Sequence, residues 1–232
     1  MNRSAFITLF AWCAGISLFT SCASNEIGNS RDVAQQKIYQ DYMISYEEGA
    51  TDCSLDCQFR FAGSRGTTLL LSAPSKIEVD GTVLKADSSS IGAFYRYKKP
   101  VQAMYGEHRA VFTDINGKTY ANKIVFPKFS LVDVPATASR NQPLSLHFDA
   151  PNLGAGDFVR IESVDADTSL TLDTQGNERF ITIPAAYLGK IKASGISFMA
   201  KLRLQAPLQQ GTEEGGRIYI WYETKPVKIK LQ

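Results

Sequence analysis

The sequence predicts an all-β protein made of two consecutive antiparallel β-sandwiches. Over many short segments, apolar and polar residues alternate with a period of two, which is the pattern of strands that bury one face. Turn-forming pairs, among them Asp80-Gly81 and Asn116-Gly117, separate these segments at hairpin spacing. A proline-containing stretch near the middle of the chain divides the strands into two groups.

The chain begins with a segment typical of a secretory signal peptide, assigned to residues 1–21. Arg3 supplies a basic start, residues 5–19 are almost all apolar or small, and Cys22 directly follows a small residue. The alternatives are a plain cleaved signal peptide with an incidental cysteine, or an uncleaved membrane anchor. However, the apolar run is shorter than the ~20 residues of a spanning helix, and Phe19 does not suit a plain small-x-small cleavage site.

The first predicted domain covers residues 37–127 and follows a polar stretch at 22–36, which is expected to be a flexible tether. Its clearest strand runs from Cys53 to Phe61, where apolar and polar residues alternate throughout. Further β-branched and aromatic runs follow at close spacing, as in an antiparallel sandwich.

The second predicted domain covers residues 128–232, with the boundary placed near Pro127. About seven alternating segments fit a sandwich of the immunoglobulin type, although the Cys…Trp…Cys core of antibody domains is absent. The last strand pair is expected between residues 196–205 and 217–231, joined by the long loop 206–216.

The chain resembles a broad group of uncharacterised Gram-negative outer-membrane lipoproteins with immunoglobulin-like β-sandwich domains. The resemblance rests on Leu18–Cys22, which looks like a bacterial lipobox, on Phe59–Phe61 leading to Gly66–Leu69, and on the hairpin Asn116–Tyr120. It implies cleavage before Cys22, diacylglycerol on the Cys22 sulfur, and attachment to the membrane through that lipid. Because Ala23 is not the aspartate that tends to mark inner-membrane retention, the resemblance implies an outer-membrane location. The group brings no known activity with it.

The charge balance argues against nucleic acid as a partner. Removing residues 1–21 takes away Arg3 and no acidic residue, so 25 basic side chains become 24 beside 23 acidic ones. The resulting net charge is about +1. Nucleic-acid-binding proteins instead carry an excess of basic residues clustered on one surface. Aromatic residues at 11% and hydrophobic residues at 44% are ample for packed cores.

The sequence carries no evident catalytic, cofactor or metal motif, so the protein is not expected to be an enzyme. His108 and His147 lack partners at metal-ligand spacing, and both are interpreted as solvated histidines on strand faces. The turns at 165–167 and 114–117 offer oxygen ligands but do not continue into a calcium loop. Turn chemistry accounts for both.

The best remaining indication of a binding site is the strand at Arg217–Glu223. Its aliphatic residues alternate with Tyr219 and Trp221, which therefore share one face. If the aliphatic face is the core, Tyr219 and Trp221 stand on the outer sheet, where they could stack on a sugar ring or a partner protein. The alternative is a central strand covered on both sides, because tryptophan is highly buried on average.

Cys53 and Cys57 are expected not to pair with each other. Four residues of extended strand separate their Cα atoms by about 13 Å, at ~3.3 Å per residue, whereas a disulfide needs less than about 7 Å. Pairing would require a turn through Ser54–Asp56, which would break the alternation of the strand.

Together these observations predict a lipid-anchored cell-envelope protein that acts as a binding or adhesion module for a glycan or a protein. Either Tyr219 and Trp221 or the loop 206–216 would form the binding surface. The alternative is a structural accessory subunit of an outer-membrane or envelope complex. A hydrolase is the weakest hypothesis.

Cys22 is expected to be the mature N-terminus and to carry lipid. Cells fed a clickable palmitate analogue should label the wild-type protein. Cys22→Ala should abolish the label and should also remove the protein from the outer-membrane fraction, because the acyl chains are expected to anchor it in the bilayer. A Cys22→Ala protein that is still labelled and still found in the outer membrane would contradict the assignment of Cys22 as the lipidated N-terminus.

Overall fold

The computed structural model describes residues 26–90, 92–164, 168–174 and 176–232. The fold is mostly β, with 55% strand and 7% helix, which confirms the predicted class at that level. The predicted signal peptide, Cys22 and the turn at 165–167 lie outside the described residues. Within the part that is described, no helix is both long enough and apolar enough to cross a membrane.

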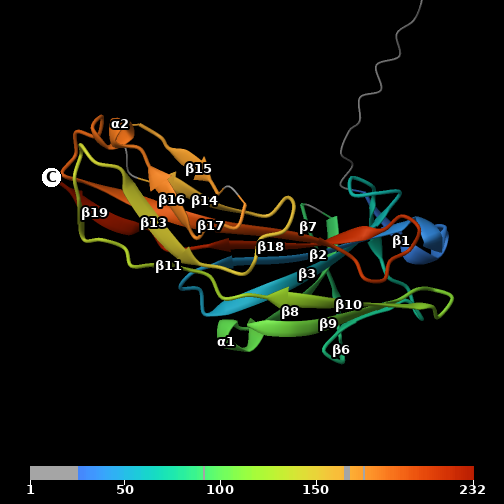
Figure 1. The fold of residues 1–232 in the computed structure, drawn as a ribbon. Coiled ribbons are helices and arrows are strands. Elements are labelled where there is room, and N and C mark those ends of the chain that lie inside the picture. Colours follow the sequence, from blue (N-terminus) through green and yellow to red (C-terminus); the bar gives the residue numbers. More distant parts are fainter. Residues whose placement is uncertain (1–25, 91, 165–167, 175) are drawn as a thin grey trace, which may run out of the picture.

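The described strands form three sheets, and the largest of them, sheet A, has 12 strands (Figure 1). Its main path runs in the order β1 (Ile27–Asn29), β4 (Thr68–Leu70), β3 (Asp52–Phe61), β2 (Ile38–Glu47), β18 (Gly216–Glu223), β17 (Gly195–Pro207), β14 (Phe158–Ser163) and β15 (Thr171–Asp173). Branches of the same sheet are β7 (Ala86–Ser89), β8 (Gly92–Pro100), β12 (Thr137–Ala138) and β19 (Val227–Leu231).

Two smaller sheets cover one face of sheet A. Sheet B contains β10 (Thr119–Phe126), β9 (Gly106–Thr113), β5 (Lys76–Val79) and β6 (Thr82–Val83), and sheet C contains β11 (Ser130–Val132), β13 (Leu144–Asp149) and β16 (Phe180–Ile183). Short helices are η1 (Ser30–Asp32), η2 (Gln35–Lys37), α1 (Val101–Met104) and α2 (Ala185–Leu188). In Figure 1, β9 and β10 lie below β2 and β3, while β13 and β11 lie toward the end that carries the C-terminus.

Local hairpins follow the sequence prediction. β5 pairs with β6 across Asp80-Gly81, and β9 pairs with β10 across Asn116-Gly117. The predicted strand at 217–231 is instead two strands, β18 and β19, which both pair with β17. Thr224 marks the step between them, where its Oγ1 accepts a hydrogen bond of 2.9 Å from the Ala200 amide.

The parallel pairing of β2 with β18 corrects the prediction of two consecutive, wholly antiparallel sandwiches. The ladder runs from Gly216 opposite Gln40 to Glu223 opposite Glu47. β2 belongs to the predicted first domain and β18 to the predicted second, so sheet A passes through both. The sequence pattern could not show this pairing, because alternation within a strand is the same whichever neighbour it has.

Gly216 allows β18 to approach β2 at the start of this ladder. A Cβ atom at residue 216 would lie 2.1 Å from the carbonyl oxygen of Gln40, a distance that real Cβ atoms do not reach. Only glycine fits where another backbone comes this close.

Sheets B and C pack on the same face of sheet A, which we call the inner face. Ile44 of β2, Leu55 of β3, Leu202 of β17 and Ile220 of β18 are all buried there. Cross-strand pairing places Ile44 opposite both Leu55 and Ile220, so these side chains share one side of the sheet. The opposite face of sheet A, the outer face, is covered by neither smaller sheet.

An aromatic cluster fills the junction between sheets B and C beneath β2 and β18. The Tyr222 ring lies 4.9 Å from that of Tyr46 and 5.9 Å from that of Phe126, measured between centroids. Its centroid also lies 5.5 Å from that of Phe129 in an edge-to-face contact. Aromatic pairs of this kind stabilise a core by about 0.5–1.5 kcal/mol beyond their buried area. The cluster therefore joins residues on both sides of Pro127.

The predicted flexible tether is wrong for residues 27–36. β1 pairs in parallel with β4, and η1 and η2 follow it directly. Ser30 is fully buried, and its Oγ accepts a hydrogen bond of 2.9 Å from the Ser72 amide. The Gln35 amide nitrogen donates to the Ser30 carbonyl at 2.6 Å. The polar side chains that suggest a flexible tether instead form hydrogen bonds with backbone groups of the folded domain.

Cys53 and Cys57 lie on β3 as free, buried thiols, in agreement with the prediction for this strand. Both side chains face the core. Burial raises the pKa of the Cys53 thiol to about 11 and raises that of Cys57 further.

The interpretation of His108 as a solvated histidine is wrong, whereas His147 is exposed as expected. The His108 residue is 5% exposed and lies on the inward-facing register of β9. Its Nδ1 lies 2.7 Å from Asp80 Oδ2, and its Nε2 lies 2.8 Å from the Met104 carbonyl oxygen. The alternation of apolar and polar residues around His108 is compatible with either face of the strand. The inward position is fixed by Asp80 and Met104, which belong to other elements of the fold.

Asp80 holds this corner of the sandwich together from a left-handed turn position, with φ of 48°. Besides His108, it accepts hydrogen bonds from the Arg109 amide at 2.8 Å and from the Tyr97 hydroxyl at 3.1 Å. Burial alone would raise the pKa of the Asp80 carboxyl. The three hydrogen bonds outweigh burial and lower the pKa below its usual value.

Asp80→Asn is expected to reduce the free energy of unfolding by about 1–2 kcal/mol at neutral pH. The loss should shrink on acidification. A carboxyl whose pKa is lowered by folding stabilises the fold above its unfolded pKa of about 4, and this contribution disappears as the pH falls through the folded value. Urea unfolding of both proteins from about pH 7 to about pH 2.5 measures the difference.

Asp133→Asn is the matched control, because Asp133 is also in a left-handed conformation, with φ of 51°, but is exposed. It should show no such pH dependence relative to the wild type. A gap between wild type and Asp80→Asn that stays constant or grows toward acid pH would contradict the role given to Asp80.

Candidate binding surface

The outer face of sheet A carries a continuous set of aromatic and charged side chains, together with Met43 and Gln58. They occupy every second position of their strands, alternating with the residues that face sheets B and C, as the period of two requires. Two of them, Asp41 and Phe94, are themselves buried. The set comprises Asp41 and Met43 on β2, Asp56, Gln58 and Arg60 on β3, Phe94 and Arg96 on β8, Phe158 and Arg160 on β14, Lys201 and Arg203 on β17, and Arg217, Tyr219, Trp221 and Glu223 on β18.

Tyr219 and Trp221 lie side by side on this face, and both are partly exposed. Their ring planes are within 9° of parallel, and the centroids are 6.5 Å apart. The intervening residues of β18 point into the core, as predicted: Ile218, Ile220 and Tyr222 are buried. Tyr219 and Trp221 therefore belong to the outer face, and their role in binding remains a prediction.

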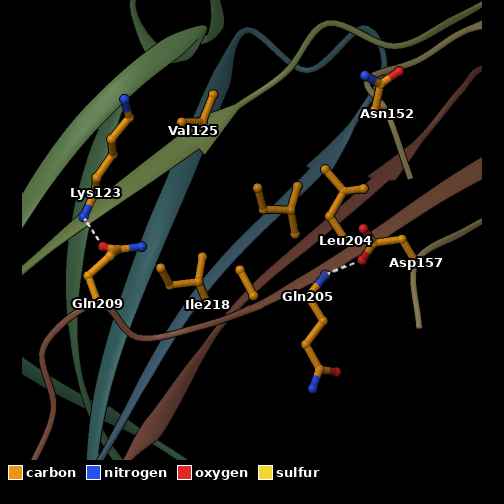
Figure 2. Close-up of a pocket in the computed structure, with 10 residues that line it drawn as sticks. Lys123, Val125, Asn152, Asp157, Leu204, Gln205, Gln209 and Ile218 are labelled. Carbon is orange, nitrogen blue, oxygen red and sulfur yellow. Dashed lines mark hydrogen bonds between the residues drawn. The ribbon is translucent and has the colours of Figure 1, made fainter. Parts of the chain in front are cut away.

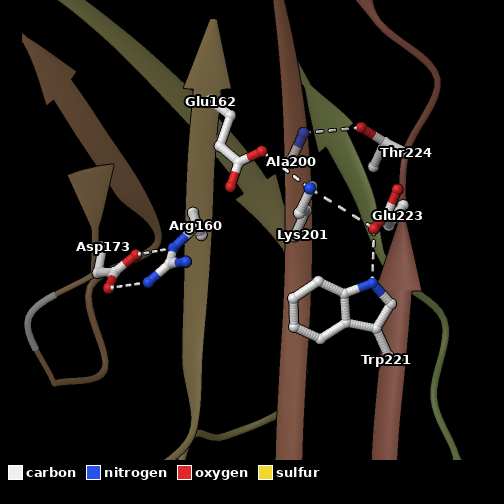
Figure 3. A network of polar contacts seen from close by, with 8 residues as sticks. All are labelled: Arg160, Glu162, Asp173, Ala200, Lys201, Trp221, Glu223 and Thr224. Atoms are coloured by element: carbon white, nitrogen blue, oxygen red, sulfur yellow. Dashed lines mark hydrogen bonds and ion pairs between the residues drawn. The ribbon is translucent and has the colours of Figure 1, made fainter. Parts of the chain in front are cut away.

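A polar network fixes the orientation of the indole (Figure 3). The Trp221 Nε1 donates to Glu223 Oε1 at 2.6 Å, and Lys201 Nζ lies 3.6 Å from the same oxygen and 2.8 Å from Glu162 Oε2. Partial burial opposes the charge of Lys201, but the two carboxylates outweigh it and raise the pKa of its ammonium group. In Figure 3 the broad face of the indole is in view, next to the strand that carries Lys201.

Arg203 lies between two aromatic rings on the same face. Its guanidinium carbon is 5.0 Å from the Phe158 centroid and 5.8 Å from the Tyr219 centroid. It is also directly opposite Trp221 in the β17–β18 register. The Arg203 Nε is buried and has no hydrogen-bond partner. Cation–π contacts stabilise such a group only partly.

A groove of about 380 Å³ adjoins the Tyr219 ring on the β2 side. Its lining residues are Asp41, Met43, Asp56, Gln58, Arg60, Ser89, Phe94, Arg96 and Arg217. Met43 is directly opposite Tyr219 in the β2–β18 register. Arg217 belongs to the groove and also lies 5.6 Å from the Tyr219 centroid. The rings and the groove are therefore one continuous surface.

Ion pairs hold most charged groups of the groove in place. Arg217 binds both oxygens of Asp41, at 2.9 and 3.0 Å, and Arg96 binds both oxygens of Asp56, at 2.7 and 2.7 Å. The bond to Asp41 raises the pKa of the Arg217 guanidinium. Bidentate pairs of this kind fix the direction of the remaining N–H groups and lone pairs.

A second cavity, of about 300 Å³, lies between β10 and the inner side of β17 and β18 (Figure 2). Val125, Ile218 and Ile220 give it an apolar lining. Polar groups at its rim are already bonded to the chain itself: Gln209 Oε1 accepts from the Lys123 amide at 2.6 Å, and an Asp157 oxygen accepts from the Gln205 amide at 2.7 Å. The interior of this cavity is therefore apolar, and the rim oxygens of Gln209 and Asp157 already accept hydrogen bonds from the chain itself.

The loop 206–216, the other predicted binding element, is tied to the fold at several points. The amides of Gln209 and Gln210 donate to Asn122 Oδ1, at 2.9 and 3.1 Å. Thr212 Oγ1 donates to the Ile38 carbonyl at 2.6 Å. The loop therefore covers the edge of β10 and the start of β2.

Among the described residues, no group of three or more His, Cys, Asp or Glu side chains is placed to hold a metal ion. Asp114 has the turn role expected from the sequence. Its Oδ1 accepts from the amides of Asn116 and Lys118, each at 2.9 Å.

No family model and no curated protein sequence matches this chain. Two solved structures resemble it distantly. One is the Bacteroides ovatus mixed-linkage glucan utilization locus protein SGBP-B in complex with a mixed-linkage heptasaccharide, at 12% identity and a TM-score of 0.24, over 79% of this chain and 53% of that one. The other is from a 1.5-MDa bacterial ice-binding adhesin retained at the host cell surface, at 10% identity and a TM-score of 0.25, over 84% of this chain and 66% of that one. The chain thus spans about half the length of the first structure.

Proposed function

We propose that the protein is a lipid-anchored binding module of the outer membrane that holds a glycan on the outer face of sheet A. The observation that carries this proposal is the pair of nearly parallel rings of Tyr219 and Trp221, beside a groove lined by charged residues together with Met43 and Phe94. The anchor would be the lipid expected on Cys22.

The chemistry of the surface suits sugars. Aromatic rings offer large, rigid apolar faces on which a sugar ring can pack, and the indole keeps its N–H bonded to Glu223. Hydroxyl groups need donors and acceptors in fixed positions beside such a face. The Arg217–Asp41 and Arg96–Asp56 pairs supply both.

The size of the surface favours a chain of sugars over a single one. The face crosses β14, β17, β18, β2, β3 and β8 without a break in hydrogen-bonded pairing. Neighbouring strands lie about 4.8 Å apart, so the crossing is about 24 Å wide. An oligosaccharide could contact the rings and the groove at once.

Binding without catalysis fits the charged groups of the groove. Hydrolysis of a glycosidic bond usually needs two carboxyl groups, one that is protonated and acts as the general acid and one that is ionised and acts as the base or nucleophile. Asp41 and Asp56 are instead each bonded through both oxygens to an arginine, so both carboxylates are already engaged by the protein itself.

A glycan array with the full-length protein, followed by tryptophan fluorescence, tests the proposal. Trp12→Phe leaves Trp221 as the single tryptophan. Its emission should be quenched by iodide, and a bound glycan should shift the emission and protect the ring from quenching. Trp221→Ala should abolish binding yet cost less stability than the about 3–5 kcal/mol of a core aromatic truncation.

Phe180→Ala is the control, because Phe180 is an exposed aromatic on sheet C, 39% accessible to solvent. It should leave binding unchanged. Unaltered binding by Trp221→Ala would remove these rings from the site. Failure to bind any glycan, together with co-purification of an envelope complex, would favour the structural accessory subunit instead.

A further inference from the structure

We infer that the bound glycan is acidic and that Arg60 and Arg203 receive its carboxylate groups. This rests on the proposed function, since it names the class of glycan for the same surface. Within the set of outer-face residues named above, acidic side chains balance the charges of the other basic groups but not those of Arg60 and Arg203.

The other basic groups in the set named above, on β8, β14, β17 and β18, each have an acidic partner in the protein. Such pairs are Arg217–Asp41, Arg96–Asp56, Arg160–Asp173, and Lys201 with both Glu162 and Glu223. The lengths of the closest contacts run from 2.6 to 2.9 Å. These four cations face five carboxylates, so the pairs themselves supply no excess positive charge to attract an anionic ligand.

Arg60 is a cation without such a partner. Its guanidinium donates to neutral acceptors, the Gly66 carbonyl oxygen at 3.2 Å and the Gln58 side-chain oxygen. Its Nε is buried and has no hydrogen-bond partner. Within the described ranges, Arg60 forms no ion pair with a carboxylate.

The groove is therefore positive overall. It contains the cations Arg60, Arg96 and Arg217 against the anions Asp41 and Asp56. Two of the three cations are neutralised by bidentate pairs, so the excess charge belongs to Arg60. A guanidinium fork matches a carboxylate in shape and charge, and it binds one more strongly than it binds a hydroxyl.

Arg203, which lies beside the rings, is a second cation without an acidic partner in the described part of the chain. Its guanidinium lies between Phe158 and Tyr219, its Nε is buried without a partner, and no ion pair to it occurs among the residues described. An uncompensated charge that is partly withdrawn from water is costly, and an incoming anion relieves that cost. A carboxylate on a sugar stacked at Tyr219 would be within reach of it.

The separation of the two arginines points to a polymer. Arg60 on β3 and Arg203 on β17 are three strand spacings apart, which is about 14 Å. The registers of β17, β18, β2 and β3 place Arg203 level with Ser54, so Arg60 lies six residues further along, about 20 Å. A single sugar cannot reach both, whereas a polysaccharide with repeated carboxylates can.

The test compares acidic polysaccharides with their own neutral forms. Polygalacturonate, alginate and hyaluronan are each titrated beside the fully methyl-esterified polymer, with full-length protein in a zwitterionic detergent. At least one acidic polymer should bind about ten-fold or more tightly than its ester, and added salt should weaken that preference. Arg60→Gln should remove most of the preference, and Arg60→Gln with Arg203→Gln should remove all of it.

Arg109→Gln is the matched control. It makes the same charge change at an exposed position of β9, on sheet B. It should keep the preference of the wild type, and unchanged urea midpoints for all variants show that each is folded.

The outcomes separate the inference from the proposed function. Equal binding of acid and ester forms, or an unaltered preference in Arg60→Gln, overturns the acidic ligand but leaves glycan binding intact. Poly-L-glutamate that binds as tightly as the best polysaccharide overturns the inference in favour of an acidic peptide. No binding by either form of any polymer tested, with glycans also failing on the array, overturns both.

Discussion

The parallel ladder between β2 and β18 is the constraint on which the rest of the structure depends. It joins strands whose paired residues are widely separated in sequence, from Gly216 with Gln40 to Glu223 with Glu47. The ladder makes a single sheet out of strands from both halves of the chain, and that sheet has a single uninterrupted outer face. Without it, Tyr219 would not lie beside Met43, and the rings would not adjoin the groove.

The inner side of the same ladder shows why it is stable. Tyr46 and Tyr222 are directly opposite each other across β2 and β18, and their rings contact Phe126 of sheet B. Phe129, which follows Pro127, packs edge-on against Tyr222. The two smaller sheets thus share one aromatic cluster, and separating them would expose it to water at a cost set by the apolar area involved.

Features that depend on neighbouring residues could be predicted from the sequence. The Asp80-Gly81 and Asn116-Gly117 hairpins, and the placement of Tyr219 and Trp221 on one face of their strand, follow from turn chemistry and from a period of two. Whether that face is exposed or covered depends on the packing of other elements, so the sequence leaves both possibilities open. The groove could not be predicted in this way, because Asp41, Arg60 and Arg217 come from three strands that only pairing brings together. The burial of His108 and the ordering of residues 27–36 likewise depend on partners distant in sequence, such as Asp80 and Ser72.

Native-state hydrogen exchange of the β2 and β18 amides is the most direct test of this single-sheet arrangement. If sheet A is one continuous unit, these amides should exchange only through global unfolding, with the same free energy as the most protected amides of β3 and β17. The account would be contradicted if the β2–β18 amides exchanged through a separate opening of much lower free energy while β3 and β17 remained protected.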